Sequence, residues 1–416
     1  MIPKLRVLRA SVVIISSWSL IMLDTNAVRR LKDTNPQLEI WWDSSPLVYA
    51  DWLVGAGRDH RDARLFDLVP GPDGHTLFAP DSLLDGATTN QPLTWQVLEK
   101  YPEVWAEWLA AQREAAGAPD AREAMWRVHI EVAARGADML APIFEATDHR
   151  RGQICCQVDP RDLADVDAML AQARRIHAAR PNIMVKLPGT REGIECVRLL
   201  TAEGVPTNVT LGFTVSQLVA VGEAAAAGLA EAQRRGTDLR NWRSCAVMML
   251  GRYEDAPPFR EQAAELGIEL TDADLRWAGI AIFRKAHALF RERGYPSKLM
   301  AASMRVGPVV DGQTRVWHLE KLAGADAVLT VFPNIFEAFL TAYAGQNLAP
   351  QITDPIPQAV LERLSRIPYF ATAYSEHGLA PDEWVDHPAL QATASAFVRS
   401  MEAIERFAAQ HMRVST

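Results

Sequence analysis

Short apolar, β-branched segments alternate with amphipathic helical segments along most of this chain of 416 residues. In the segment 162–181, for example, apolar side chains recur every three to four residues, as on one face of a helix. Such alternation is typical of a parallel sheet whose strands are joined by crossover helices. Eight segments are predicted as strands: 38–44, 84–90, 153–160, 182–188, 204–211, 245–251, 297–303 and 327–333.

Eight strands of this kind favour closure into an α/β fold, a (β/α)8 TIM barrel. A doubly wound open sheet is the alternative. It would be expected to carry a G-x-G-x-x-G turn after an early strand, and the sequence has none. Two helical stretches, 93–116 and 120–147, are longer than one crossover requires and predict a helical insertion plus a barrel helix. The segment 387–412 predicts a long C-terminal helix over one end of the barrel.

The N-terminal segment, residues 1–23, joins three cationic residues to an apolar run over 10–23. That run is too short for a transmembrane helix and resembles the apolar part of a secretory signal. No small-x-small cleavage pattern follows it. We therefore expect 1–23 to be an extension outside the fold, with Met22 as an alternative start and a secretory signal as the competing interpretation. Residues 24–416 are expected to form one barrel domain.

Composition limits the classes of partner. A net charge of −8 argues against a surface that binds nucleic acid, and no segment suggests a membrane protein. A local basic pocket for phosphate stays open, because one or two arginines suffice for it. The ten histidines show no triad-like context, so we expect surface or capping roles for nearly all. The four cysteines show no C-x-x-C spacing, which predicts structural thiols, no metal site and a reducing cytoplasm: Cys155, Cys156, Cys196 and Cys245.

Polar residues stand at or just after the ends of seven predicted strands. In a barrel of this type the carboxyl ends of the strands carry the active site. So many polar residues at these positions predict a lined polar pocket rather than a coincidence. They are Asp43, Asn90, Gln157, Lys186, Asn208, Thr210, Arg252, Ser303 and Arg305.

Lys186 is the most informative of them, because it ends an apolar run, "NIMVKLP", where a charge is costly. Burial disfavours the ammonium form of an amine, and a neutral amine can attack a carbonyl carbon to form a Schiff base. The structural alternative is a lysine that is ion-paired or extends its amine to solvent at a strand end. The residues alone leave both interpretations open.

The block "PNIMVKLPGTREGIECVRLLTAEGVPTNVTLGFTVSQ" (181–217) closely resembles the transaldolase family, class I aldolases of the (β/α)8 type. Shorter matches follow the family's order, and the resemblance covers about residues 38–335. The shorter matches are "IWWDSSP" (40–46), "GATTNQP" (86–92), "LGR" (250–252), "AASMR" (301–305) and "LTVFP" (329–333).

The resemblance implies a role for each matching residue. Lys186 would be the Schiff-base lysine and Asp43 an acid/base group. Asn90 and Asn208 would hydrogen-bond the dihydroxyacetone part of the substrate, and Thr210 would help to hold a catalytic water. The phosphate of the sugar would be bound by Arg252, Ser303 and Arg305. No cofactor or metal is implied. The expected partner is a phosphorylated sugar, and a homodimer is an open expectation.

The chain departs from the family pattern on the third and sixth strands. Gln157 stands where most of the family has an acid/base glutamate. It is expected to be a catalytic residue that orients a water, but a glutamine cannot exchange a proton with that water at neutral pH. The fructose-6-phosphate aldolase branch also has glutamine there but adds a tyrosine, whose position here is Met249, while Val247 replaces a serine. Asp43 is the remaining ionisable candidate, with Tyr253 as a substitute.

We therefore expect transfer of a dihydroxyacetone unit from a ketose phosphate, of the fructose 6-phosphate or sedoheptulose 7-phosphate type, to an aldose. Simple aldol cleavage or addition, as in the glutamine-bearing branch, is one alternative. A catalytically decayed barrel that binds a sugar phosphate is another.

Overall fold

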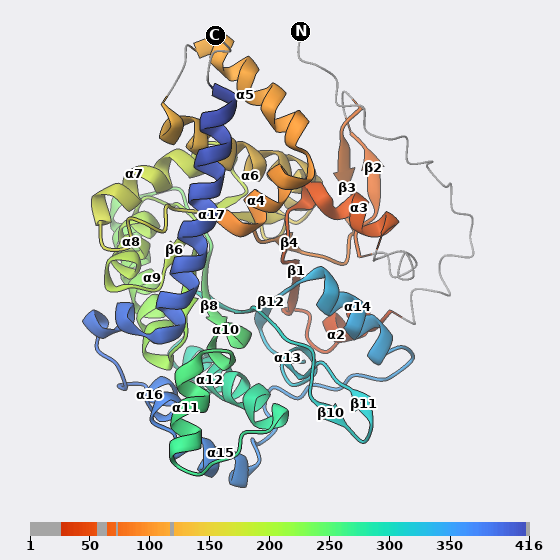
Figure 1. The fold of residues 1–416 in the computed structure, drawn as a ribbon, viewed down its shortest axis with the longest axis vertical. Coiled ribbons are helices and arrows are strands. Elements are labelled where there is room, and N and C mark those ends of the chain that lie inside the picture. The colour runs from red at the N-terminus through yellow and green to blue at the C-terminus, as the bar shows by residue number, and fades with distance from the viewer. Residues whose placement is uncertain (1–25, 56–64, 72–73, 117–119, 413–416) are drawn as a thin grey trace.

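A computed structural model describes residues 26–55, 65–71, 74–116 and 120–412. Within them, eight parallel strands close a barrel in the order β1-β12-β9-β8-β7-β6-β5-β4 (Figure 1). Each overlaps one of the eight predicted segments, so the predicted (β/α)8 barrel is confirmed. The strands are β1 (Glu39–Trp42), β4 (Gly86–Ala87), β5 (Gln153–Gln157), β6 (Ile183–Pro188), β7 (Thr207–Gly212), β8 (Ser244–Met249), β9 (Lys298–Ala302) and β12 (Ala327–Val331).

The helices between these strands begin and end where the sequence provides caps. The side chain of Thr190 accepts the N–H of Gly193 at the start of α8 (Arg191–Ala202), as a helix N-cap does. Thr214 and Gln217 form a capping box at the start of α9 (Val215–Arg235), which Gly236 ends in the left-handed conformation. The other long barrel helices are α7 (Val166–His177), α12 (Asp272–Arg293) and α14 (Pro333–Ala342).

The insertion between β4 and β5 is helical, as predicted, but contains one helix more. The stretch 93–116 divides into α4 (Gln91–Lys100) and α5 (Pro102–Ala116). The break occurs at Pro102, because proline has no backbone N–H to donate and disfavours helical backbone at the residue before it. The second stretch is α6 (Ala121–Ala146), which packs on β5 as the barrel helix.

The predicted C-terminal helix is α17 (Pro388–Met412). It packs along α4, α5 and α6 and also contacts β7 and α10 (Leu250–Glu254), the short helix that follows β8 (Figure 1). Because α10 begins where β8 ends, α17 lies beside the carboxyl ends of these strands. The expectation that this helix covers one end of the barrel is therefore confirmed, and the end is the one that carries the candidate residues.

Shorter elements complete the described chain. Two antiparallel hairpins, β2 with β3 and β10 with β11, lie outside the barrel. The remaining elements are α2 (Ala27–Asp33), η2 (Pro46–Val48), α3 (Tyr49–Val54), β2 (Leu68–Pro70), β3 (Thr76–Phe78), α11 (Pro257–Glu265), β10 (Val309–Val310), β11 (Gln313–Thr314), α13 (Trp317–Glu320), α15 (Gln358–Ser365), α16 (Pro368–Tyr374) and η5 (Pro381–Asp386).

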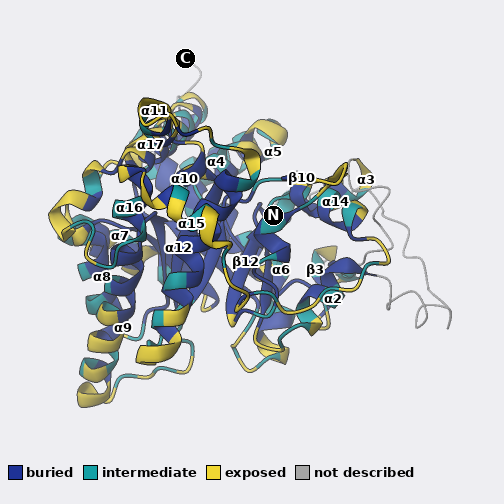
Figure 2. Ribbon diagram, turned by 90° about the horizontal axis from the view of Figure 1, so that it is seen from below, coloured by how far each residue is buried: buried dark blue, intermediate teal, exposed yellow. Residues whose placement is uncertain are grey.

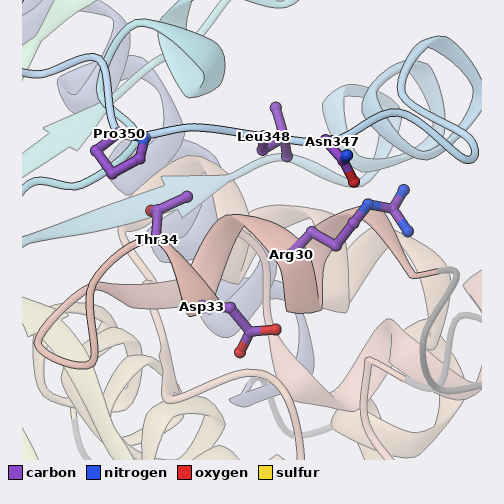
Figure 3. Close-up of a pocket in the computed structure, with 6 residues that line it drawn as sticks. All are labelled: Arg30, Asp33, Thr34, Asn347, Leu348 and Pro350. Atoms are coloured by element: carbon purple, nitrogen blue, oxygen red, sulfur yellow. The ribbon is translucent and has the colours of Figure 1, made fainter.

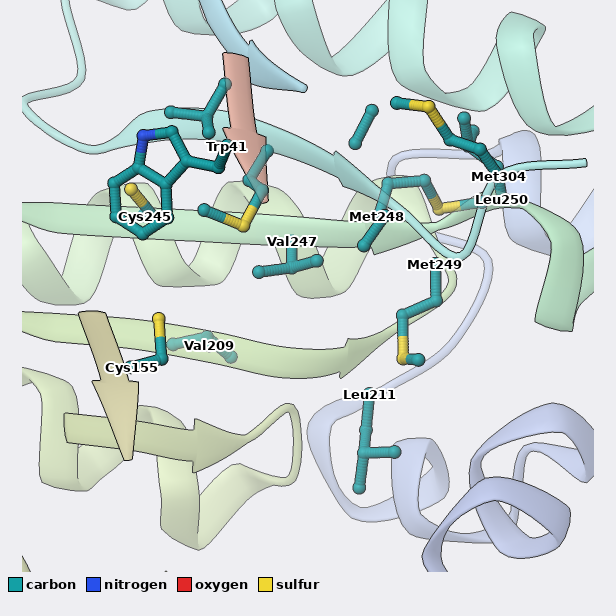
Figure 4. Packing of buried hydrophobic residues seen from close by; sticks show 14 of the residues in the cluster. Trp41, Cys155, Val209, Leu211, Cys245, Val247, Met248, Met249, Leu250 and Met304 are labelled. Atoms are coloured by element: carbon teal, nitrogen blue, oxygen red, sulfur yellow. The ribbon is translucent and has the colours of Figure 1, made fainter. Parts of the chain in front are cut away.

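The barrel strands form the centre of the hydrophobic core, and exposed residues gather on the outer helices (Figure 2). All four cysteines are buried and unpaired, as predicted for structural thiols. Along β8, Cys245, Val247 and Met249 follow one another toward the strand's end, with Trp41 and Cys155 near the first of them (Figure 4). Apolar and thiol side chains thus occupy this part of the core.

A buried ion cluster lies at the amino-terminal end of the barrel. Glu39 accepts hydrogen bonds from Arg243 Nη2 at 2.6 Å and Lys298 Nζ at 2.9 Å. Burial by itself raises the pKa of Glu39, but the two cations outweigh it and hold the pKa at about 2. The Glu39 carboxylate therefore stays charged at neutral and mildly acidic pH.

Replacing Glu39 with glutamine is expected to lower the free energy of unfolding by about 3 kcal/mol at pH 7, because Arg243, which is largely buried, loses its carboxylate partner and Lys298 is left with Asp326 as its ion-pair partner. A group with a depressed pKa stabilises the fold above its unfolded value, and that contribution is lost as pH falls toward about 2. Urea unfolding of both proteins should therefore show a difference that is constant near neutral pH and shrinks below pH 4.5. A difference that stays constant in acid would contradict this account.

The expected N-terminal extension, 1–23, lies outside the described residues. Among the helices that the structure describes, none combines the length and the apolar character needed to cross a bilayer.

Candidate active site

Three predicted polar residues stand side by side on neighbouring strands. In the parallel register, Gln157 on β5 is paired with Lys186 on β6, and Lys186 is paired with Asn208 on β7. Paired residues of adjacent strands project from the same face of a sheet. All three are buried, and Lys186 is 5% exposed. The lysine therefore lies near the carboxyl end of an apolar strand, as predicted, and the strand register places it between two amide side chains.

Asp43, directly after β1, faces the same interior. Its backbone N–H donates to the carbonyl of Val331 at 2.9 Å, which extends the β1–β12 pairing. Burial raises the pKa of Asp43 to about 6, against the opposing effects of the Lys186 charge and of a hydrogen bond from Thr88. Since the Lys186 cation acts on this carboxylate, the acid/base candidate and the nucleophile candidate belong to one site. A pKa near 6 suits proton transfer close to neutral pH.

Two hydroxyl groups that the sequence analysis did not single out support Asp43. Thr88 hydrogen-bonds the carboxylate, and its hydroxyl is also hydrogen-bonded to the hydroxyl of Thr330 on β12. Both threonines are buried. They lie inside the motifs "GATTNQP" and "LTVFP", so the signal was present in the sequence. What it lacked was the strand order, which places β4 and β12 on either side of β1 and so brings both threonines beside Asp43.

Two amide oxygens beside Lys186 are available to a ligand. Oε1 of Gln157 and Oδ1 of Asn208 are buried and have no hydrogen-bond partner among the described residues. The Asn208 amide donates only to the sulfur of Met300, at 3.4 Å. A buried acceptor without a partner costs about 1–3 kcal/mol, which hydroxyl groups of a bound sugar would relieve.

Asn90 is placed differently from its neighbours in the site. It is the N-cap of α4, and its Oδ1 accepts the backbone N–H of Leu93 at 3.0 Å. The oxygen thus already accepts one bond from the helix and keeps one further lone pair, while the side-chain NH2 group can donate to a ligand.

The sixth strand offers no acid or base in place of the family glutamate. The hydroxyl of Thr210 lies 3.5 Å from the sulfur of Met249, and Val247 precedes Met249 on the interior-facing side of β8 (Figure 4). The suggestion that Tyr253 substitutes is wrong. It is fully buried, its hydroxyl donates to the carbonyl of Tyr369 on α16, and burial raises its pKa well above 10.

Ser303 and Arg305 form a compact unit after β9. Ser303 has a left-handed backbone with φ of 58°, and its carbonyl accepts both the N–H of Gly251 and Nη1 of Arg305, each at 2.9 Å. A Cβ on Gly251 would lie 2.2 Å from that carbonyl oxygen, so the position requires glycine. Arg305 also pairs with Asp255, with Nη2 at 2.6 Å from Oδ2.

Two further arginines, Arg252 and Arg399, add positive charge beside Arg305. Among the described residues the side chain of Arg252 makes no ion pair or hydrogen bond. Burial lowers its pKa, and the charges of Arg305 and of Arg399 on α17 lower it further, while Asp255 opposes them. Three guanidinium groups beside one carboxylate favour an anion such as a phosphate. Arg399 was missed because no local motif marks it; only the packing of α17 brings it here.

A separate pocket lies away from these residues. It is formed between α2 and the chain that follows α14 (Figure 3). None of the candidate site residues lines it. Its walls are Arg30, Asp33, Thr34, Asn347, Leu348 and Pro350.

Comparison with known proteins finds transaldolases among the relatives of this chain. The transaldolase of Thiobacillus denitrificans is 32% identical over 222 residues, which are 53% of this chain and 58% of that protein. The transaldolase of Thermobifida fusca is 31% identical over 231 residues, 55% of this chain and 58% of that protein. The matches thus span little more than half the length of these relatives.

A third relative, the transaldolase of Renibacterium salmoninarum, is 28% identical over 282 residues, which are 67% of this chain and 70% of that protein. The family model described as Transaldolase/Fructose-6-phosphate aldolase matches residues 75–405, which is most of the sequence and includes every candidate residue except Asp43. The chain therefore belongs to the transaldolase/fructose-6-phosphate aldolase family.

Proposed function

We propose that this protein is a Schiff-base transferase of the transaldolase type, acting on a ketose phosphate. The observation that carries the proposal is that Lys186 and Asp43 are both buried at strand ends, close enough to interact electrostatically, and that burial raises the pKa of Asp43 to about 6. An amine and a carboxyl group with these properties, inside one barrel mouth, supply a nucleophile and a proton carrier.

In the proposed reaction the Lys186 amine attacks C2 of the ketose, and loss of water gives an iminium ion. Asp43 removes the proton from the C4 hydroxyl. The C3–C4 bonding electrons then flow into the iminium, which becomes an enamine, and the aldose part leaves as an aldehyde. The enamine carbon next attacks the aldehyde of an acceptor, whose oxygen receives the proton from Asp43. Hydrolysis of the new iminium releases the product ketose and restores the lysine.

The amide groups of Gln157 and Asn208 are assigned to the hydroxyls of the bound dihydroxyacetone unit, with Asn90 as a further donor. Thr210 is assigned to the water that enters and leaves at C2. Ser303, Arg252 and Arg305 are assigned to the phosphate. These roles need no cofactor or metal. Supporting observations are the unpartnered oxygens of the two amides and the arginines that converge from α10 and from the end of β9.

Replacing Arg305 with alanine is expected to raise KM for fructose 6-phosphate about 10- to 150-fold, since a hydrogen bond to a charged group contributes about 1.5–3 kcal/mol. The reactivity of free dihydroxyacetone, which has no phosphate, should change less than about threefold. Steady-state kinetics with fructose 6-phosphate and the rate of adduct formation with dihydroxyacetone measure the two effects. Equal losses on both would remove the phosphate role from Arg305.

Simple aldol cleavage is a second candidate, favoured by the amide of Gln157 at the position of the usual glutamate. Acceptor dependence separates the two reactions. In a transferase, fructose 6-phosphate should yield glyceraldehyde 3-phosphate continuously only when an acceptor such as erythrose 4-phosphate is added. Continuous release without any acceptor would establish the aldolase instead. Absence of turnover and of any adduct would establish the decayed barrel.

We further propose that residues 24–416 act as one catalytic domain, and that the protein works in the cytoplasm. Support for the compartment is the set of four buried thiols, none of them in a disulfide. A homodimer stays a prediction, which the mass of the protein in solution, by light scattering, would test.

A further inference from the structure

A chain of three buried polar side chains lies beneath Arg305. The backbone N–H of Arg305 donates to Nδ1 of His318 at 3.0 Å, and Nε2 of His318 lies 2.7 Å from Oε1 of Glu254. The other carboxylate oxygen of Glu254 pairs with Nη1 of Arg276. His318 is 0% and Glu254 1% exposed, so water does not compete for these bonds. The prediction that nearly all histidines have surface or capping roles is wrong: four of the ten are buried, namely His129, His287, His318 and His387.

The hydrogen bonds fix the protonation of the imidazole ring. Nδ1 accepts the N–H of Arg305 and so carries no proton; Nε2 then carries the ring proton and donates it to Glu254. Burial lowers the pKa of His318 well below 6.5, and the charges of Arg276 and Arg305 act in the same direction. The ring therefore stays neutral near pH 7, and the direction of both bonds does not change.

These hydrogen-bonded side chains connect three helices to the segment after β9. Glu254 is on α10, His318 on α13 and Arg276 on α12, and α12 contacts both of the other two (Figure 1). Arg305 lies past the end of β9 where the backbone is in no helix or strand. Its N–H has no ladder partner there, and His318 supplies the acceptor that regular structure would otherwise provide.

We propose that His318 is a positioning residue for the phosphate: through Glu254 it ties the backbone of Arg305 to α10, and so sets the spacing between Arg305 and Arg252. The two arginines follow different strands, and Glu254 is only two residues from Arg252 on the same short helix. The contact of Gly251 with the Ser303 carbonyl braces the same junction from the other side. The inference rests on the proposed function, because it takes the ligand to be a sugar phosphate.

Three substitutions of His318 separate the effects of its two hydrogen bonds, to the Arg305 N–H and to Glu254. The side-chain oxygen of asparagine can lie near the place of Nδ1, so His318→Asn keeps an acceptor for Arg305 and loses the donor to Glu254. The side-chain nitrogen of glutamine reaches the place of Nε2, so His318→Gln keeps that donor and loses the acceptor. His318→Leu loses both. The matched control is His287→Leu, which removes another buried imidazole, on α12, that makes no bond to Arg305.

The kinetic readout is the ratio of kcat/KM for fructose 6-phosphate to the rate of adduct formation with dihydroxyacetone. His318→Leu and His318→Gln should lower this ratio about 10- to 100-fold, the size expected from a misplaced binding group. His318→Asn should recover much of the loss, and His287→Leu should leave the ratio unchanged. Equal losses on both substrates, or equal effects of asparagine and glutamine, would overturn the inference and leave His318 a structural residue.

A second readout does not depend on catalysis. Inorganic phosphate should raise Tm of the wild type and of His287→Leu by the same amount, and should raise Tm of His318→Leu and His318→Gln clearly less. A rise equal in all variants would overturn the inference. Failure of the wild type to form any adduct would instead refute the proposed function, and the Tm comparison would still decide whether His318 positions a phosphate site.

Discussion

Lys186→Met should lower kcat by on the order of 10⁴–10⁶-fold, the largest effect expected of any single change in this protein. Methionine has similar length and fits the apolar end of β6, so the fold should persist. The reaction loses the atom that bonds to C2 of the ketose, and no described neighbour can replace it, because Gln157 and Asn208 are amides. Single-turnover and steady-state assays of purified protein measure the loss.

A matched control is Lys285→Met. Lys285 lies on α12, partly buried, with Nζ 4.3 Å from the ring centre of Tyr374, and it is not among the site residues. Its loss should change kcat less than about twofold. Retention of more than about one hundredth of the wild-type kcat in Lys186→Met would show that the reaction does not depend on this amine.

Asp43→Asn should lower kcat about 10²–10⁴-fold, the usual contribution of a positioned acid/base group. Asparagine keeps the shape and the hydrogen bond to Thr88 but cannot take up a proton. As a base Asp43 must be ionised, so kcat/KM of the wild type should fall about tenfold per pH unit below its pKa of about 6. The variant should lack this fall, and a variant that keeps it would assign the titration to another group.

The same substitution should stabilise the protein. The pKa of Asp43 is raised from its ordinary value of 3.8 to about 6, so the folded state binds the proton more tightly than the unfolded chain does. Its contribution to stability is fully present below about pH 4 and is lost as pH rises through about 6. Asparagine is neutral throughout, so Asp43→Asn should gain about 1–3 kcal/mol over wild type at pH 8 and little at pH 4. Urea unfolding at both values measures the gain.

Much of this molecule could be predicted from its sequence, because local patterns decide the elements. All eight barrel strands overlap segments predicted as strands from their local composition, and Lys186 was identified by a charge at the end of such a segment. In a parallel barrel every carboxyl end meets at one mouth, so the chain position of a residue already implies its neighbourhood.

What the sequence could not provide are contacts between distant segments. Arg399 approaches Arg252 only because α17 packs across the barrel mouth, and nothing near residue 399 signals it. His318 lies in a short helix after a hairpin, and its importance comes from Glu254 and Arg305, 64 and 13 residues away. Tyr253 was misjudged for the same reason: its neighbour Arg252 is at the site, while its own side chain packs against α16.

The central claim is that Lys186 forms a covalent bond with a ketose. Wild-type protein incubated with dihydroxyacetone or fructose 6-phosphate, reduced with borohydride and digested should yield a dihydroxyacetone-derived mass increase on the peptide that contains Lys186. Lys285→Met should give the same modified peptide, and Lys186→Met none. An increase located on another lysine, or one that persists in Lys186→Met, would contradict the account.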